Sequence, residues 1–220
     1  FGEAVAKVAP LVDELKKRYS IEFFSVGGGM GIIYRRALES GSGNWWHDHG
    51  GEESAFSVAD YAAAIVPTLR RIGLRTLLEP GRFLVGNAGI LLTRVRYLKK
   101  SEHKKFVIVD AGMNDLIRPA LYQIYHEIVP VREPAGLRTE SVDVVGPVCE
   151  SGDFFAQDRE LPEMNEGALV AVMSAGAYGF TMASNYNSRP LPAEVLIAGD
   201  RMSLIRRRQT MEDLIREEST

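Results

Sequence analysis

The sequence predicts two kinds of structure in succession: the last βα units of a parallel (β/α)8 barrel, followed by an all-β domain. Short apolar runs at 21–26 and 75–78 each end in a glycine-containing loop, at 27–29 and 79–82. A helical pattern separates the two runs, and strand-like runs fill the chain from about residue 88 onward. Alternating strands and helices are typical of parallel sheets, whereas many short strands separated by turns are typical of a small barrel or sandwich.

The two loops have the composition of a phosphate site. Because glycine has no Cβ, an anion can approach the backbone N–H groups of Gly27-Gly28-Gly29 and of Gly81. In parallel barrels a phosphate commonly lies at the loops that follow the last two strands. A glycine run can also be a simple tight turn, but its position directly after a strand favours a phosphorylated ligand.

We expect two helices in the first region. Residues 3–19 have apolar side chains at helical spacing, with charged side chains mostly opposite them. The second helix covers 58–72, because Ser57 can cap its first turn and Gly73 can end it. Between the helices, 37–56 has the composition of an irregular insertion. The apolar stripes are Val5, Val8, Leu11, Val12 and Leu15 in the first helix, and Tyr61, Ile65 and Leu69 in the second.

The second region alternates β-rich runs with turn residues. A charged turn at 99–105 separates the first two strands, and residues 210–217 favour a short terminal helix. This pattern predicts an all-β domain. The expected strands are 90–98, 106–110, 127–132, 138–145, 168–174, 193–198 and 202–206.

The overall composition is ordinary for a globular protein, with 45% hydrophobic and 25% charged residues. A net charge of -3 gives no indication of nucleic-acid binding. No apolar stretch approaches the length of about 18 residues that a membrane span needs, and the first residues do not resemble a signal peptide. The single cysteine, Cys149, excludes an internal disulfide and suits a reducing, cytoplasmic environment.

Charged residues stand at positions where they can bind a ligand. Glu79, at the end of a strand, can be a surface carboxylate or an acceptor for a protonated ring nitrogen. Arg82 can be solvated or can bind a carboxylate with both arms of its guanidinium. Arg118 and Tyr122 lie in an apolar, proline-containing segment, where a charge needs a partner; a structural ion pair is the alternative to a ligand.

The remaining candidates are a thiol, a carboxylate and a phenol. The Glu150 carboxylate disfavours the thiolate of Cys149, which argues against a strong nucleophile and suits a proton donor. Tyr178, in the turn Gly176-Ala177-Tyr178-Gly179, can be a structural donor or a phosphate contact. We expect no metal site at His47, His49, Glu52 and Glu53, because no regular element holds them.

Taken together, five blocks of sequence closely resemble the diaminopimelate decarboxylases, fold-type III pyridoxal-phosphate enzymes with an alanine-racemase-like barrel. The resemblance implies conversion of meso-2,6-diaminopimelate to L-lysine and CO₂, the last step of lysine biosynthesis. It also implies that residues 1–88 are the C-terminal part of the cofactor-binding barrel and 89–220 the C-terminal β domain. The blocks are GGGMGIIY at 27–34, EPGRFLVGNAG at 79–89, VDAGMNDLIRPALY at 109–122, VGPVCESGD at 145–153 and GAYGFTMASNYNSRP at 176–190.

The resemblance assigns cofactor contacts to both regions. Glu79 would accept a hydrogen bond from the pyridine nitrogen of pyridoxal 5'-phosphate and keep it protonated. The phosphate contacts would be Gly28, Gly29, Gly81, the backbone of Arg82 and the hydroxyl of Tyr178.

The resemblance also assigns substrate contacts. Arg82, Arg118 and Tyr122 would bind the distal carboxylate of diaminopimelate, with Tyr178 close by. Glu150 would contact the distal amine, and Cys149 would return a proton after CO₂ leaves. In this family the residues at the positions of Cys149 and Glu150 reach into the partner subunit's site, which implies a homodimer.

One feature of the family has no match in this sequence. Its Schiff-base lysine lies early in the barrel, and no segment here resembles that region. The chain also begins without Met, in what reads as the middle of a helix. We therefore expect a C-terminal half that is inactive alone. Two alternatives are another basic-amino-acid decarboxylase of this fold, in which Arg82 and Arg118 would lack a carboxylate to bind, and a non-catalytic dimerisation partner.

Overall fold

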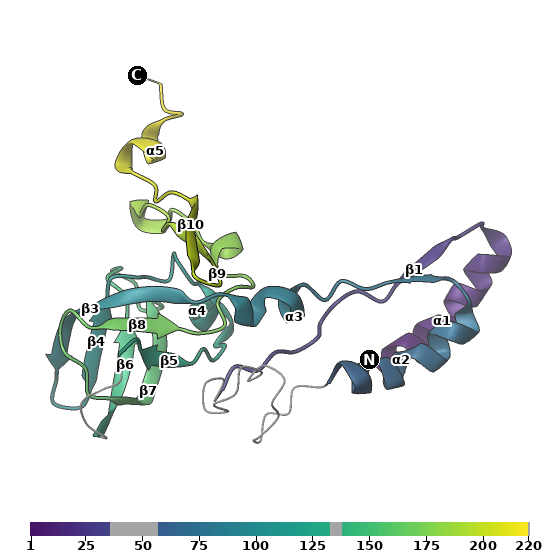
Figure 1. Ribbon diagram of the computed structural model, residues 1–220, viewed down its shortest axis with the longest axis horizontal. Helices are drawn as coiled ribbons and strands as arrows, with labels where there is room; N and C mark the ends of the chain where they lie inside the picture. The colour runs from purple at the N-terminus through teal and green to yellow at the C-terminus, as the bar shows by residue number, and fades with distance from the viewer. Residues whose placement is uncertain (36–56, 133–137, 220) are drawn as a thin grey trace. The chain divides into compact units, whose positions relative to one another are not determined.

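The computed structural model describes residues 1–35, 57–132 and 138–219. The chain forms two compact units, Phe1–Asn87 and Ala88–Thr220, and each is described by itself (Figure 1). The expected insertion at 37–56 lies outside the described residues, as do His47, His49, Glu52 and Glu53. No helix in the described part of the chain is long and apolar enough to cross a membrane.

The first unit contains the predicted βα arrangement. Strand β1 (Phe23–Ser25) pairs in parallel with β2 (Arg75–Leu77), with Ser25 opposite Leu77. Helix α1 (Gly2–Arg18) precedes β1, and α2 (Val58–Ile72) connects the two strands. A short helix α3 (Gly81–Val85) and the 3-10 turn η1 (Gly86–Ala88) follow β2. The strand expected at 21–26 has only three residues, all paired with β2.

Helices α1 and α2 pack together through an apolar core. Ser57 caps α2 by accepting a hydrogen bond from the backbone N–H of Asp60, and Gly73 ends it with a left-handed φ of 69°. The stripe expected in α2 is buried, but the one expected in α1 is partly wrong: Val8 and Leu11 are exposed. The buried positions of α1 follow i, i+4, i+7 spacing, which leaves those two at the side of the contact. The buried core residues are Val5, Ala9, Val12, Met30, Tyr61, Ile65, Leu69 and Ile72.

The second unit is built on a six-stranded mixed sheet in the order β5-β8-β3-β4-β6-β7. Strands β4 and β6 are parallel, and the other neighbours are antiparallel. The predicted fold class, βα units followed by a β domain, is confirmed. The strands are β3 (Leu91–Lys100), β4 (Lys105–Val109), β5 (Ile128–Pro130), β6 (Thr139–Val145), β7 (Phe154–Pro162) and β8 (Leu169–Val172).

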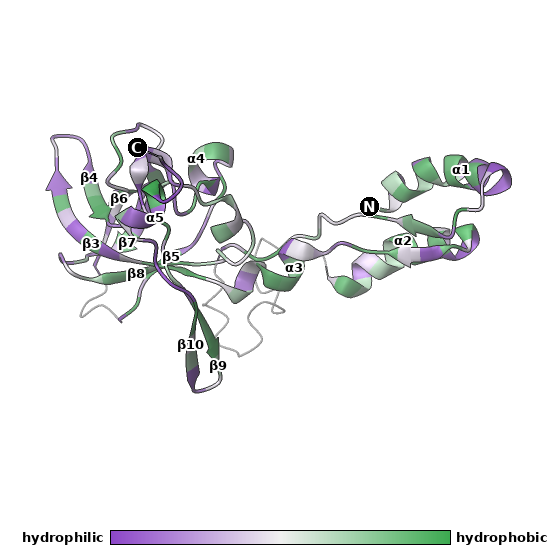
Figure 2. Ribbon diagram, turned by 90° about the horizontal axis from the view of Figure 1, so that it is seen from above, coloured by the Kyte–Doolittle hydropathy of each residue, from purple (hydrophilic) through white to green (hydrophobic). Residues whose placement is uncertain are grey.

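Valines from the central strands form the core of this sheet. Val95 and Val109 are fully buried, and Phe155 from β7 packs with them. Short elements follow the sheet: the 3-10 turns η2 (Phe180–Met182) and η3 (Tyr186–Ser188), the hairpin β9 (Glu194–Ala198) and β10 (Arg201–Arg206), and α5 (Met211–Ile215). Figure 2 shows that most of the β9–β10 hairpin is hydrophobic.

One strand and one α-helix of the second unit were not expected from the sequence. Strand β7 carries charged residues at Asp158, Arg159 and Glu160, which strand patterns usually lack. It lies at the edge of the sheet, where charged side chains can remain in water. Helix α4 (Arg118–Tyr122) is only five residues long, too short to show a helical period.

Candidate functional site

The first unit fixes the carboxylate of Glu79 at the ends of the two parallel strands. Ser25, the last residue of β1, donates a hydrogen bond from Oγ to Glu79 Oε1 at 2.5 Å. The same Oγ accepts a hydrogen bond from the backbone N–H of Gly27 at 3.2 Å. The backbone N–H of Glu79 in turn donates to Gly27 O at 2.9 Å. A negative charge is therefore held in one orientation beside the glycine loop.

The glycine loop lies so close to the second loop that side chains do not fit. A Cβ on Gly28 would overlap the carbonyl oxygen of Glu79. Gly27 and Gly29 have φ angles of 76° and 92°, which side-chain-bearing residues rarely adopt. Gly81 donates its N–H to Glu79 O at 2.9 Å. The structure thus brings four of the predicted cofactor residues, Gly28, Gly29, Glu79 and Gly81, together at one end of the strand pair.

Arg82 joins the same group through its side chain. Its Nε donates to Met30 O at 3.2 Å, and its Nη2 donates to Gly29 O at 3.4 Å. The guanidinium therefore fastens α3 to the glycine loop. A guanidinium has five N–H donors, so these bonds leave capacity for a ligand carboxylate.

In the second unit, Arg118 and Tyr178 lie against one another. Arg118, the first residue of α4, is only 3% exposed. Its guanidinium carbon lies 5.3 Å from the centre of the Tyr178 ring, within the range of a cation–π contact. Tyr122 follows one helical turn later and is 59% exposed. One short helix thus carries a buried cation and, one turn later, an exposed phenol.

The turn that carries Tyr178 has a strained backbone. Tyr178 has a φ of 61°, unusual for a residue with a side chain. A Cβ on the adjacent Gly179 would overlap Ala175 O, and one on Gly89 would lie 2.6 Å from the Cα of Gly176. Strain of this kind clusters at binding sites, where surrounding contacts hold it. The close packing explains why small residues surround the phenol.

Cys149 and Glu150 lie exposed on the turn that joins β6 to β7. The turn is closed by backbone hydrogen bonds from Glu150 N to Val148 O at 2.8 Å and from Asp153 N to Glu150 O at 3.0 Å. It lies beside α4, because a Cβ on Gly152 would lie 3.9 Å from the Cβ of Ala120. The thiol, the carboxylate and α4 therefore share one region of the second unit.

The predicted site residues form two groups, one in each unit. Gly28, Gly29, Glu79, Gly81 and Arg82 belong to the first, and Arg118, Tyr122, Cys149, Glu150 and Tyr178 to the second. Among the described residues, no cluster of three histidine, cysteine or acidic side chains could hold a metal ion.

Sequence reasoning missed two residues that orient these groups. Ser25 holds Glu79, and Asp153 holds the turn of Cys149. The signal for Ser25 was its position, two residues before the glycine loop at the end of a strand. Asp153 ends the VGPVCESGD block, but its hydrogen-bond partner 40 residues earlier leaves no local pattern.

Comparison with known protein families finds a match that covers most of the chain, including residues of both groups. Residues 12–176 match the family described as "Pyridoxal-dependent decarboxylase, C-terminal sheet domain".

The chain belongs to this family.

Its curated relatives are diaminopimelate decarboxylases. The protein from Aquifex aeolicus is 43% identical over 216 residues, which cover 98% of this chain and 48% of the relative. The protein from Pseudomonas fluorescens is 46% identical over 220 residues, which cover 100% of this chain and 49% of the relative. The chain thus spans about half the length of the curated relatives it matches, and the resemblance of its five blocks to this family is confirmed.

Solved structures of the family share the fold. Diaminopimelate decarboxylase from M. jannaschii, in complex with L-lysine, has a TM-score of 0.87 and 37% identity, covering 100% of this chain and 48% of that one. The enzyme from Helicobacter pylori, also complexed with L-lysine, has a TM-score of 0.83 and 41% identity, and the match covers 98% of this chain and 49% of that one.

Proposed function

We propose that the polypeptide containing this chain is a diaminopimelate decarboxylase, a pyridoxal-dependent carboxy-lyase that converts meso-2,6-diaminopimelate to L-lysine and CO₂. The observation that carries the proposal is Arg118, a cation buried beside Tyr178 within the VDAGMNDLIRPALY block. The second carboxylate of diaminopimelate would accept charge-assisted hydrogen bonds from this guanidinium. The curated relatives named above, and the two solved relatives with bound L-lysine, support the same reaction.

The first unit fits pyridoxal 5'-phosphate. A fixed carboxylate at Glu79 suits a protonated ring nitrogen. The open space beside Gly27 and Gly81, where a Cβ would meet nothing within 4 Å, suits close approach of a phosphate. When bound, this cofactor supplies an electron sink for the negative charge left at the α-carbon after CO₂ leaves. Gly28, Gly29, Gly81 and the backbone of Arg82 would hold its phosphate, with the hydroxyl of Tyr178.

The second unit would provide substrate recognition and a proton. Arg118 would bind the distal carboxylate with two charge-assisted hydrogen bonds, assisted by Arg82, Tyr122 and Tyr178. Glu150 would accept a hydrogen bond from the distal ammonium. Cys149 would donate the proton that replaces CO₂ on the α-carbon. A thiol suits this role because its S–H group can donate the proton directly.

We further propose a cytoplasmic homodimer in which Cys149 and Glu150 serve the partner subunit's site. The single cysteine supports the compartment. The exposure of Cys149 and Glu150 on this turn supports the sharing. These 220 residues, without a match to the family's Schiff-base lysine, would be inactive alone.

The test uses the complete reading frame in which these residues lie, with pyridoxal 5'-phosphate added. We expect release of CO₂ and L-lysine from meso-diaminopimelate, and little turnover of ornithine, arginine or lysine. Turnover of those substrates with none of diaminopimelate would identify another decarboxylase of this fold. No turnover of any of them, in a protein that binds the cofactor, would favour a non-catalytic partner.

Replacing Arg118 tests the distal-carboxylate assignment. Arg118→Ala removes charge-assisted hydrogen bonds worth roughly 1.5–3 kcal/mol, so kcat/KM for diaminopimelate should fall at least about tenfold. The control is Arg138→Ala, which removes an exposed arginine that lies 3.9 Å from the Glu163 carboxylate. Unchanged kinetics in Arg118→Ala would show that Arg118 does not bind the distal carboxylate.

A further inference from the structure

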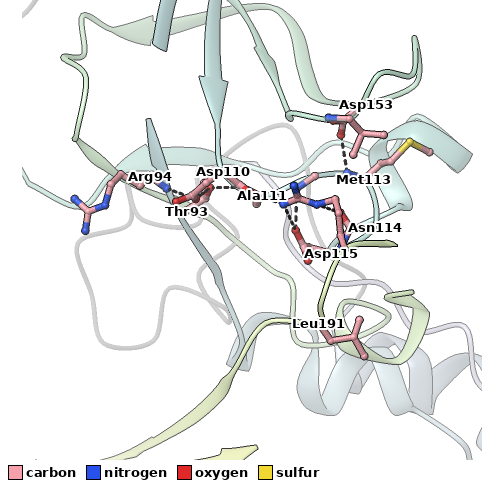
Figure 3. Close-up of polar contacts among 12 residues, drawn as sticks. Thr93, Arg94, Asp110, Ala111, Met113, Asn114, Asp115, Asp153 and Leu191 are labelled. Atoms are coloured by element: carbon pink, nitrogen blue, oxygen red, sulfur yellow. Dashed lines mark hydrogen bonds and ion pairs between the residues drawn. The ribbon is translucent and has the colours of Figure 1, made fainter. Parts of the chain in front are cut away.

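A buried carboxylate links the two candidate segments of the second unit. Asp153 is 4% exposed. Its Oδ1 accepts a hydrogen bond from the backbone N–H of Met113 at 2.6 Å, shown in Figure 3. Its Oδ2 accepts one from the backbone N–H of Val148, also at 2.6 Å. The two oxygens of one side chain thus hold two pieces of backbone that are 35 residues apart in the sequence.

The backbone beside this carboxylate packs so closely that the neighbouring glycines have no room for a side chain. A Cβ on Gly146 would overlap both oxygens of Asp153, and one on Gly112 would lie 3.5 Å from Oδ1. The backbone N–H of Gly146 also donates to Asp153 O at 3.0 Å. Burial raises the pKa of the Asp153 carboxyl, and the N–H groups of Val148 and Met113 act against that shift. Backbone therefore closes around the carboxylate from both segments.

The two anchored residues stand directly before the candidate site residues. Val148 precedes Cys149 and Glu150, and Met113 begins the segment that leads into α4 and Arg118. That segment has its own internal supports, visible in Figure 3. Asp115 accepts from the N–H of Gly112 at 2.8 Å and from Asn114 Nδ2 at 2.9 Å. Asp153 differs from these supports because it joins the segment to the turn of Cys149.

We propose that Asp153 is a positioning residue, which sets the Cys149–Glu150 turn relative to the segment that carries Arg118. Both of its oxygens act as acceptors from N–H groups. An asparagine offers one acceptor oxygen and places an N–H₂ group against the other N–H donor. One of the two anchors is then lost and the turn shifts away from α4. The consequence for catalysis rests on the proposed function; the geometric role does not.

The unique cysteine gives a direct probe of the turn. Cys149 is labelled with a trifluoromethyl thiol reagent, and ¹⁹F spectra are recorded for the 220-residue chain and for Asp153→Asn. We expect a changed chemical shift or a broadened line in Asp153→Asn. An unchanged spectrum in that variant would overturn the proposal.

Asp143→Asn is the matched control. Asp143 is also a buried carboxylate of this unit and also accepts a backbone N–H, from Asp158 at 2.7 Å, as well as Lys104 Nζ at 2.8 Å. It touches neither candidate segment through these bonds. The control should lose stability in thermal unfolding and yet keep the wild-type ¹⁹F line. A change as large as that in Asp153→Asn would mean that any loss of stability moves the turn, which would overturn a specific role.

Hydrogen exchange in the unsubstituted chain keeps the proposal testable if Asp153→Asn does not fold. The amides of Met113 and Val148 should exchange at least about tenfold more slowly than the exposed amides of the same turn, because both donate to a buried group. Fast exchange at either amide, with the sheet protected, would contradict the geometry.

The catalytic consequence is measured in the complete polypeptide. Asp153→Asn should lower kcat for diaminopimelate at least about tenfold, with cofactor binding retained. Asp143→Asn should retain kcat. Normal kcat in Asp153→Asn would overturn the catalytic part. If the wild type decarboxylates nothing while the ¹⁹F and exchange results hold, the proposed function fails and the positioning role stands.

Discussion

His126 is a fully buried imidazole beside the candidate substrate arginine. Its Nδ1 lies 2.8 Å from Met173 O, and because a carbonyl only accepts, Nδ1 carries the proton. Burial lowers the pKa of His126, and the positive charges of Arg118 and Arg159 lower it further. The folded protein therefore keeps this ring neutral at pH values where an exposed histidine is already charged.

This neutral histidine predicts how stability changes with pH. As the pH falls below about 6.5, the unfolded chain binds a proton at His126 and the folded chain does not. The free energy of unfolding should therefore fall from pH 7 to pH 5, by up to about 1.4 kcal/mol per pH unit from this residue. Urea unfolding at several pH values measures the slope. His126→Asn, whose amide can still donate to Met173 O, should flatten it.

His103→Asn is the control for this slope. His103 lies exposed in the turn between β3 and β4, so its replacement should leave the slope as in the wild type. Equal slopes in His126→Asn and the wild type would show that His126 is protonated in the folded state over this range.

At the scale of elements, the approach of the two strand-end loops depends on Gly28. A Cβ at this position would meet backbone, the Glu79 carbonyl, which cannot move aside as a flexible side chain can. Gly28→Ala should therefore destabilise the first unit by about 1–3 kcal/mol, the usual cost of overpacking. Gly31→Ala is the matched control, because a Cβ there meets nothing within 4 Å.

Unfolding monitored by circular dichroism or by hydrogen exchange in α2 measures both variants. Gly28→Ala should also weaken binding of pyridoxal 5'-phosphate by the complete polypeptide. Equal stability of Gly28→Ala and Gly31→Ala would mean that the two strand-end loops can move apart to admit a Cβ without loss of stability. The close approach of the loops would then not explain why residue 28 is a glycine.

The sequence predicted the elements better than the contacts between them. Ser57 and Gly73 mark the ends of α2, and the stripe Tyr61, Ile65 and Leu69 is buried, because capping and helical spacing are local properties. Strand β7 was missed because an edge strand tolerates charges. Asp153 was missed because its partner Met113 is brought close only by the fold. Capping and apolar spacing can be read locally, whereas the anchoring of a site depends on contacts between distant segments.

At the scale of the whole molecule, the ten candidate residues are divided between two units. The first unit holds the group suited to a phosphorylated cofactor, and the second holds a buried cation, a phenol and a thiol. If Cys149 and Glu150 serve the partner subunit's site, each active site combines residues of two polypeptides. Two different inactive subunits could then complete one active site together.

Mixing two inactive variants of the complete polypeptide tests this sharing. Cys149→Ala should bind cofactor and turn over slowly, and a variant without the Schiff-base lysine should be equally poor. In an isologous dimer with free exchange, half of the dimers are mixed, and one of the two sites in each receives both a good lysine and a good cysteine. Activity should therefore recover to about one quarter of the wild-type number of sites. If Cys149 takes no part in the reaction, Cys149→Ala alone stays active and mixing adds nothing. No recovery from two well-folded, inactive variants would show that both residues serve the same subunit's site.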